Sequence, residues 1–263
     1  MLDLQQQDDG ILFPSAFTQG KSPIPINGLI WMGEPDFMRQ QIARKLEEDY
    51  ACIKIKIGTL DFDQECAILA NIRKKFSPDL LDLRVDANGA FNPKTALQKL
   101  QKLATYHLHS IEQPIAAGQW QAMAELCRQT PVPIALDEEL IGVTEPAQQA
   151  QLLDELQPQY IILKPSLLGG FNQAEAWIEL AEKRNIGWWV TSALESAIGL
   201  SAIAQWTAWL QKNRKQNLNK NMAQGLGTGK IYSNDIATPL CLQGDKLHYN
   251  KNQNWNYRSI DLH

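Results

Sequence analysis

The chain has 263 residues, of which 44% are hydrophobic and 21% charged, and its formal net charge is −4. This composition is typical of a globular protein with a sizeable core, and the length fits one large α/β barrel or two smaller domains. The small negative charge gives no reason to expect nucleic acid or an acidic membrane surface as a partner. The sequence has neither a membrane-length apolar run nor a secretory signal, so we expect a cytoplasmic protein.

Short apolar runs alternate with amphipathic segments along most of the chain, after a polar lead-in segment at 1–24 that is rich in glycine and proline. The apolar runs predict strands at 24–33, 52–58, 81–88, 108–114, 132–139 and 159–166, a strand and its loop at 187–196, and a last strand with a glycine-rich loop at 221–229. The amphipathic segments predict helices at 34–50, 61–76, 93–104, 118–129, 145–155, 171–184 and 196–212.

Strands that alternate with helices predict a parallel sheet, and this number of units predicts a closed TIM-type (β/α)7β barrel over residues 25–229. The structural alternative is an open, doubly wound sheet. It predicts a glycine-rich phosphate turn after an early strand, and the sequence contains no GxGxxG motif. Residues 230–263 show no clear period, and we expect them to pack on the barrel or on a domain that caps it.

Three successive strands end in a carboxylate: Asp86 in LRVDANGA, Glu112 in HSIEQPIA and Asp137 in IALDEEL. The spacing is about one strand plus one helix, so the three acids can lie at the same ends of neighbouring strands, where barrels have their active sites. For a single acid, a helix cap or a surface ion pair is the better interpretation. Three carboxylates in this register predict a binding site for a hard cation that prefers oxygen ligands. The expected cation is Mg²⁺, with Mn²⁺ as the alternative.

Strand alternation places Lys54 and Lys56 on one face of the strand at 52–58, with isoleucines on the other face. Lysines inside a barrel are costly unless they have a function there, and the alternative is an edge strand with a solvated lysine face. The same alternation places Arg84 on the same face of its strand as Asp86. By contrast, His109 has the opposite parity to Glu112, so we expect His107 and His109 to be structural.

Lys56 and Lys164 come from strands on opposite sides of the predicted barrel, with the three acids between them. A substrate carboxylate bound at the cation would have one lysine on each face, which suits removal of a proton α to that carboxylate. A lysine base needs a lowered pKa, and we expect Lys54 and the cation, as like charges, to lower the pKa of Lys56.

The motifs KIK (54–56), DAN (86–88), EQP (112–114), DE (137–138) and KP (164–165) resemble the signature of the enolase superfamily, muconate-lactonizing-enzyme subgroup. Within that subgroup, PINGLIWMG (25–33), PSLLGG (165–170), SALES (192–196) and GLGT (225–228) resemble the o-succinylbenzoate synthase family. Members of that family are Mg²⁺-dependent dehydratases of menaquinone and phylloquinone biosynthesis. The resemblance implies a small-molecule carboxylate as the substrate.

The resemblance also implies roles for the matching residues. Lys56 would take the α-proton of a cyclohexadiene carboxylate and return it to the departing hydroxyl, a syn elimination, while Lys164 would stabilise the enediolate. The metal ligands would be Asp86, Glu112 and Asp137, with Glu138 orienting Lys164 or a ligand. The residues that would line the substrate pocket are Lys54, Arg84, Asn88, Ser192, Ser196, Gly225 and Gly227.

Simpler structural roles stand beside these assignments. Ser192 or Ser196 can cap a helix, GLGT can be a tight turn, and Arg84 can form an ion pair inside the barrel. The same catalytic residues also permit an N-acylamino acid racemase, a dipeptide epimerase or a muconate cycloisomerase. Epimerases of the family typically carry DxD at the last strand, where this chain has GLGT.

Members of the family also carry an α+β capping domain before the barrel. Few residues precede Lys54 here, so we expect most of that domain to be absent from this chain. An uncapped barrel mouth would expose apolar surface and favour self-association. The same expectation leaves open a third function, that of an inactive barrel that binds a metal without turnover.

Overall fold

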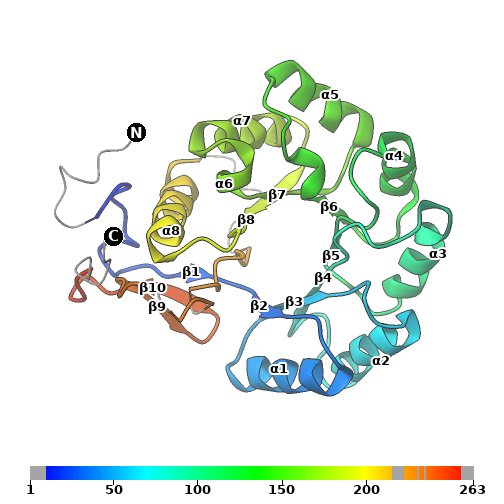
Figure 1. Ribbon diagram of the computed structural model, residues 1–263, viewed down its shortest axis with the longest axis horizontal. Coiled ribbons are helices and arrows are strands. Elements are labelled where there is room, and N and C mark those ends of the chain that lie inside the picture. Colours follow the sequence, from blue (N-terminus) through cyan, green and yellow to red (C-terminus); the bar gives the residue numbers. More distant parts are fainter. Residues whose placement is uncertain (1–9, 215–221, 230, 234, 256–263) are drawn as a thin grey trace.

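A curled parallel sheet forms the centre of the computed structural model, which describes residues 10–214, 222–229, 231–233 and 235–255. Within these residues, seven strands pair in chain order, so each strand lies beside its sequence neighbours (Figure 1). They are β2 (Gly28–Ile30), β3 (Cys52–Lys56), β4 (Asp82–Asp86), β5 (Ser110–Glu112), β6 (Ile134–Leu136), β7 (Tyr160–Leu163) and β8 (Gly187–Val190). Chain-order parallel pairing confirms the barrel architecture predicted from the alternating pattern.

Helices form a ring outside the sheet and connect its consecutive strands (Figure 1). They are α1 (Pro35–Glu47), α2 (Phe62–Arg73), α3 (Pro93–Ala104), α4 (Trp120–Gln129), α5 (Pro146–Leu156), α7 (Phe171–Glu182) and α8 (Ala197–Asn213). Local sequence defines where some of them start. Asp61 accepts a hydrogen bond from the Asp63 amide at the start of α2, and Asn92 caps α3 just before Pro93. Within the described residues, no helix is long and apolar enough to span a membrane.

The sheet closes through a short segment rather than through a full eighth strand. Gln224 bridges in parallel to Ile26, and Gly225 bridges in parallel to Thr191, just after β8. The Asn27 amide donates to Gln224 O at 3.0 Å, and the Gly225 amide donates to Val190 O at 2.8 Å. The strand predicted at 221–229 is therefore reduced to these two bridges among the described residues, with residue 221 lying outside them.

The strand predicted at 24–33 is divided in two, which corrects the sequence-based assignment. Its first part, β1 (Ile24–Pro25), pairs antiparallel with β10 (Lys246–Tyr249), which pairs with β9 (Leu240–Gln243). The second part, β2, joins the parallel sheet. This three-stranded sheet lies between α8 and α1 in Figure 1, and the sequence pattern of 230–263 did not predict its hairpin. Residues 1–9, 230, 234 and 256–263 of the two predicted terminal segments lie outside the described residues.

Apolar side chains fill two cores, one on each side of the sheet. Ile53 and Ile55 of β3 are fully buried in the large cluster between strands and helices, as their parity predicts. Each such side chain contributes about 1.5–3 kcal/mol by burial. A smaller cluster of Ala135, Ile162 and Trp189 fills the inside of the barrel. Side chains therefore fill the barrel interior below the site, as in other barrels of this type.

Candidate active site

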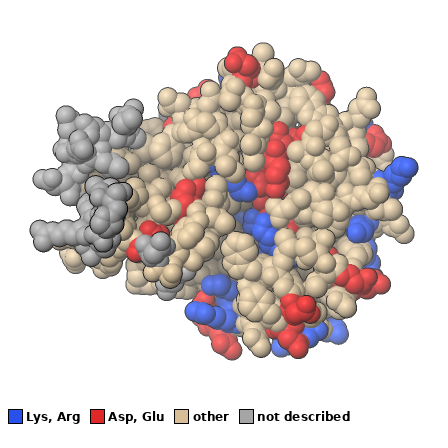
Figure 2. All heavy atoms as spheres, in the orientation of Figure 1, with Lys and Arg blue, Asp and Glu red and all other residues tan. Residues whose placement is uncertain are grey.

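Charged side chains meet at the carboxyl ends of the strands. Lys56, Asp86 and Glu112 are the last residues of β3, β4 and β5 and stand in register across the sheet. Asp137 and Lys164 each follow directly after a strand, β6 and β7. Figure 2 shows basic and acidic atoms side by side at the centre of this face, inside the ring of helices. The structure therefore brings together the five residues that the sequence analysis placed at the reaction centre.

These side chains form one network of ion pairs. Lys54 Nζ lies 3.1 Å from Asp86 Oδ2 and 2.9 Å from Glu112 Oε2, and Lys56 Nζ lies 2.8 Å from the same Asp86 oxygen. On the opposite side, Lys164 Nζ pairs with Asp137 Oδ2 and lies 3.9 Å from Glu112 Oε1. The three acids are almost completely buried, so their charges are little screened by water.

Burial and neighbouring charges shift the pKa values of this network. Burial, followed by the nearby Asp86 carboxylate, raises the pKa of Glu112 to about 8. For Asp86, burial alone would raise the pKa, but Lys54 and Lys56 outweigh it and hold the pKa below its usual range. Burial alone would lower the pKa of Lys54 and Lys164, yet the adjoining carboxylates raise both. Crowded carboxylates of this kind favour additional positive charge at their centre.

The three carboxylates suit a divalent cation. All the donors are oxygen atoms, and Glu112 Oε1 is buried and accepts no hydrogen bond, so it has a free ligand position. Within the described part of the chain, no three His, Cys, Asp or Glu side chains are arranged to hold a metal ion as placed. Lysine ammonium groups face the oxygens of Asp86 and Asp137. A cation at this point would compete with the lysines for those oxygens.

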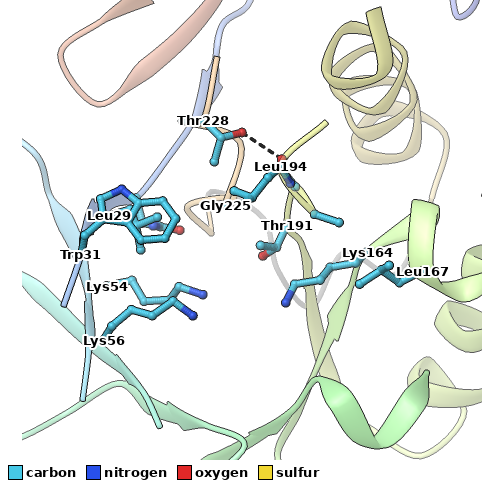
Figure 3. A pocket seen from close by; sticks show the side chains of 14 residues that line it. Leu29, Trp31, Lys54, Lys56, Lys164, Leu167, Thr191, Leu194, Gly225 and Thr228 are labelled. Carbon is cyan, nitrogen blue, oxygen red and sulfur yellow. Dashed lines mark hydrogen bonds between the residues drawn. The ribbon is translucent and has the colours of Figure 1, made fainter. Parts of the chain in front are cut away.

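A cavity of about 250 Å³ opens above the network. Its lining residues are Asn27, Leu29, Trp31, Lys54, Lys56, Lys164, Leu167, Thr191, Ser192, Ala193, Leu194, Gly225, Gly227 and Thr228. Figure 3 shows Lys54 and Lys56 reaching in from one wall and Lys164 from the opposite wall. Apolar side chains line both walls nearer the opening, and three ammonium groups lie at the base. The cavity thus suits an anionic molecule with an apolar body.

Four of the residues predicted to bind substrate line this cavity: Lys54, Ser192, Gly225 and Gly227. The polar groups of Ser192 are already used, because its hydroxyl donates to Glu195 and its amide donates to Gly225 O. Gly225 is required by space, since a Cβ there would lie 2.5 Å from Thr191 Oγ1.

Arg84, Asn88 and Ser196 are not among the described residues that line the cavity. Arg84 is buried inside the barrel, where its guanidinium lies 4.2 Å from the centre of the Trp189 ring and donates to Ala223 O. Among the described residues it neither lines the cavity nor forms the ion pair considered from sequence, and the aromatic face beside it stabilises its charge. Ser196 precedes α8 without a side-chain capping bond, and Asp235 Oδ2 accepts from the Ala197 amide in its place.

Asn88 and Glu138 act on the Lys56 side of the site. Asn88 Oδ1 accepts from Lys56 Nζ at 2.6 Å, and Asn88 Nδ2 donates to Glu138 Oε1 at 2.9 Å. Glu138 was expected to orient Lys164 or a metal ligand. In the structure it is connected to Lys56 through Asn88.

Gln113 is a functional candidate that sequence reasoning did not single out. Its side chain is completely buried, and Oε1 accepts from the backbone amides of Asp137 and Glu139. Its Nε2 donates to Glu139 Oε2, while Glu139 Oε1 accepts from the Gly118 amide. Gln113 therefore fixes the backbone on which Asp137 stands. Its place in the EQP motif was visible in the sequence, but its partners are 24 and 26 residues away and needed the fold.

Comparison with known proteins agrees with this architecture. The family model described as "Enolase C-terminal domain-like" matches residues 37–235. The chain belongs to this family. Membership implies a divalent metal ion, in agreement with the oxygen-rich site.

Relatives within the family include an o-succinylbenzoate synthase from Desulfotalea psychrophila (strain LSv54 / DSM 12343), which is 56% identical over 247 residues. That match covers 94% of this chain and 65% of the relative, so the chain spans slightly less than two thirds of the relative's length. The crystal structure of MenC from Desulfotalea psychrophila LSv54 superposes with a TM-score of 0.82 at 56% identity, covering 91% of this chain and 64% of that one.

Other proteins match at lower identity. A muconate lactonizing enzyme structure has a TM-score of 0.75 at 21% identity, over 90% of this chain and 65% of that one, which is a likeness of fold. An L-Ala-D/L-Glu epimerase from Bacillus subtilis (strain 168) is 27% identical over 179 residues, covering 67% of this chain and 48% of the relative.

Proposed function

We propose that the chain is an o-succinylbenzoate synthase. It would catalyse the syn dehydration of 2-succinyl-6-hydroxy-2,4-cyclohexadiene-1-carboxylate to 2-succinylbenzoate, a step of menaquinone and phylloquinone biosynthesis in the cytoplasm. The observation that carries the proposal is the placement of Lys56 and Lys164 on opposite walls of one cavity, with three carboxylates between them. The 56% identity to a relative of that name supports this reaction over the others that the same residues permit.

Asp86, Glu112 and Asp137 would hold Mg²⁺, with Mn²⁺ as an alternative. When bound, the cation stabilises negative charge that develops on the substrate carboxylate. The three acids approach from neighbouring strand ends, which are rigid, so their positions are fixed before the substrate arrives. Gln113 would help by holding the backbone of Asp137 in place.

Lys56 would act as the base. It would take the α-proton, and the electron pair of the broken C–H bond would move into an enediolate. Lys56 would then return the proton to the leaving hydroxyl, so that the C–O bond breaks and water departs as the ring becomes aromatic. Asn88 supports this role, because its bond to Nζ holds the lysine near the cavity base. Lys164, whose ammonium form is favoured by adjoining carboxylates, would stabilise the enediolate from the other side.

The cavity composition supports a dicarboxylate with a flat ring. Its base presents three ammonium groups, and its walls near the opening carry Leu29, Trp31, Leu167 and Leu194. The ring and succinyl chain would contact these apolar groups.

Racemisation of an N-acylamino acid is a second candidate function. It is favoured by the same pair of lysines on opposite walls, because one can remove and the other deliver a proton at a single carbon. A racemase would use both lysines as acid and base, whereas the dehydration uses Lys56 alone for proton transfer.

The two functions are separated by testing the protein with Mg²⁺ on different substrates. The cyclohexadiene carboxylate is followed by its loss of absorbance, and an N-acylamino acid and a dipeptide are followed by α-proton exchange in D₂O. We expect rapid loss of the cyclohexadiene carboxylate and at most slow exchange of the others. Exchange of the N-acylamino acid without any loss of the cyclohexadiene would identify a racemase, and inactivity on all three would support a barrel that binds metal without turnover.

Self-association through the barrel mouth is also part of the proposal. Trp31, Leu167 and Leu194 are 39%, 42% and 38% exposed around the opening, and contact between two copies would bury these apolar side chains. We expect light scattering to show a mass that rises with protein concentration. A constant monomer mass at high concentration would contradict this expectation.

A further inference from the structure

Glu195 ties together the loop that follows β8. Its carboxylate accepts hydrogen bonds from Ser192 Oγ at 2.7 Å and from the Ala193 amide, which lies 3.1 Å from Oε1 and 2.9 Å from Oε2. It also accepts from Ser166 Oγ at 2.5 Å. Both oxygens are thus occupied by donors from the protein itself, and Glu195 does not line the cavity. This acid therefore acts on the loop and not on a bound molecule.

The hydroxyl of Ser192 is fully committed in the same arrangement. It accepts from the Leu194 amide at 2.9 Å and from Thr228 Oγ1 at 2.8 Å, the second of which is the dashed line in Figure 3. Since both of its acceptor positions are taken, its proton can only be donated, and Glu195 receives it. An amide in place of this carboxylate would direct an N–H group either at Ser192 Oγ, whose acceptor positions are taken, or towards the Ala193 amide, which can only donate.

Leu194 adopts a backbone conformation that needs such support. Its φ is +68°, in the left-handed region that costs a residue with a side chain roughly 1–2 kcal/mol. Its amide is held by Ser192, and its carbonyl accepts from Tyr232 Oη at 2.8 Å. This conformation turns the Leu194 side chain into the cavity lining.

Ser166 connects this loop to the other active-site wall. It belongs to α6 (Pro165–Leu168), which starts directly after Lys164 and carries Leu167. Figure 3 shows Lys164, Leu167 and Leu194 on the same side of the cavity. Through Ser166, Glu195 therefore joins the segment after β7 to the segment after β8, and both segments supply an apolar side chain to that wall.

We propose that Glu195 is a positioning residue that sets the apolar wall formed by Leu167 and Leu194, and so determines how tightly the ring and tail of the substrate are held. This inference rests on the proposed function for the identity of the substrate. The wall contacts the non-reacting part of the substrate, so losing its position weakens ground-state and transition-state binding alike. The chemical step, which depends on groups at the base of the cavity, keeps its rate.

The test compares E195Q, S166A and the control E155Q. The control removes the same charge from an exposed glutamate of α5 whose partner is Gln151. For each protein we measure KM and kcat for the cyclohexadiene carboxylate, the Kd of 2-succinylbenzoate, and amide hydrogen exchange of residues 192–195. We expect E195Q to raise KM and Kd by about tenfold, with kcat within about threefold of wild type, and to speed exchange at Ala193 and Leu194. S166A should show a smaller change in the same direction, and E155Q none.

Three outcomes separate the possibilities. Exchange and binding that are unchanged in E195Q would overturn the positioning role. A fall in kcat with KM unchanged would overturn it as well, because Glu195 would then act on the chemical step. If the wild-type protein neither converts the substrate nor binds 2-succinylbenzoate, the proposed function fails. In that case, faster exchange in E195Q would still support the role of Glu195 in holding the loop after β8, and unchanged exchange would overturn it.

Discussion

Lys54 links two of the three acids of the charged site. Its ammonium group contacts both Asp86 and Glu112, whereas Lys56 contacts only Asp86 of the three acids. Sequence parity predicted that both lysines face inward, and they do. Strand alternation could not show that the buried Lys54 ammonium group contacts two of the proposed metal ligands. That contact depends on how far each side chain reaches across neighbouring strands.

Gln113 is the residue whose substitution best isolates the support of the metal site. Gln113→Met keeps the volume but removes the acceptor for the Asp137 and Glu139 amides, so we expect metal affinity to fall about 10- to 100-fold. Titration calorimetry with Mg²⁺ or Mn²⁺ measures the change. Gln119→Met is the matched control, since its side chain donates to the nearby Ala116 carbonyl and to none of the proposed metal ligands. Equal affinities in both variants would contradict the role.

At the scale of elements, the strands that carry charged residues were the easiest to predict. The strands predicted at 52–58, 81–88 and 108–114 contain β3, β4 and β5, which end two residues earlier than predicted, at Lys56, Asp86 and Glu112. The segment at 224–225 was harder, because long-range contacts rather than local pattern decide its conformation. The hairpin of β9 and β10 was missed for the same reason, since its partner β1 lies more than two hundred residues earlier.

Closure of the barrel depends on the absence of a side chain at Gly225. An added Cβ would lie 2.5 Å from Thr191 Oγ1 and 2.8 Å from its Cγ2, at the point where the last segment bonds to the end of β8. We expect Gly225→Ala to lower the free energy of unfolding by about 1–3 kcal/mol, as measured in urea. Adding Thr191→Ala should restore part of the loss, because it removes both of these close atoms. Strictly additive losses in the double variant would refute this explanation.

For the whole molecule, the inside of the barrel gives stability a dependence on pH. His109 stacks on Tyr160 with ring centres 5.1 Å apart, and burial followed by the charge of Arg84 lowers its pKa to about 4. The unfolded histidine has a pKa of about 6.5. Between these values the unfolded chain binds a proton that the folded chain does not, so stability falls as pH drops from about 6.5 to 4, by about 2–3 kcal/mol.

His109→Gln should flatten that part of the profile. Urea unfolding at pH 7 and pH 5 gives the free energy of unfolding of each protein. Comparing the pH-dependent change in the wild type with that in His109→Gln removes the contribution of other titrating groups. A loss on acidification that is as large in His109→Gln as in wild type would show that His109 is not the source. The sequence predicted a structural histidine here, but not its position among Arg84, Tyr160 and Trp189 inside the barrel.

The central claim is that Lys56 performs proton transfer in the dehydration while Lys164 stabilises charge. The most direct test is the rate of loss of the cyclohexadiene carboxylate with Mg²⁺, for wild type, Lys56→Ala and Lys164→Ala, with the Kd of 2-succinylbenzoate measured in parallel. We predict that Lys56→Ala lowers kcat by about 10²- to 10⁴-fold, with the product still bound. Substrate loss in Lys56→Ala at the wild-type rate would contradict the claim.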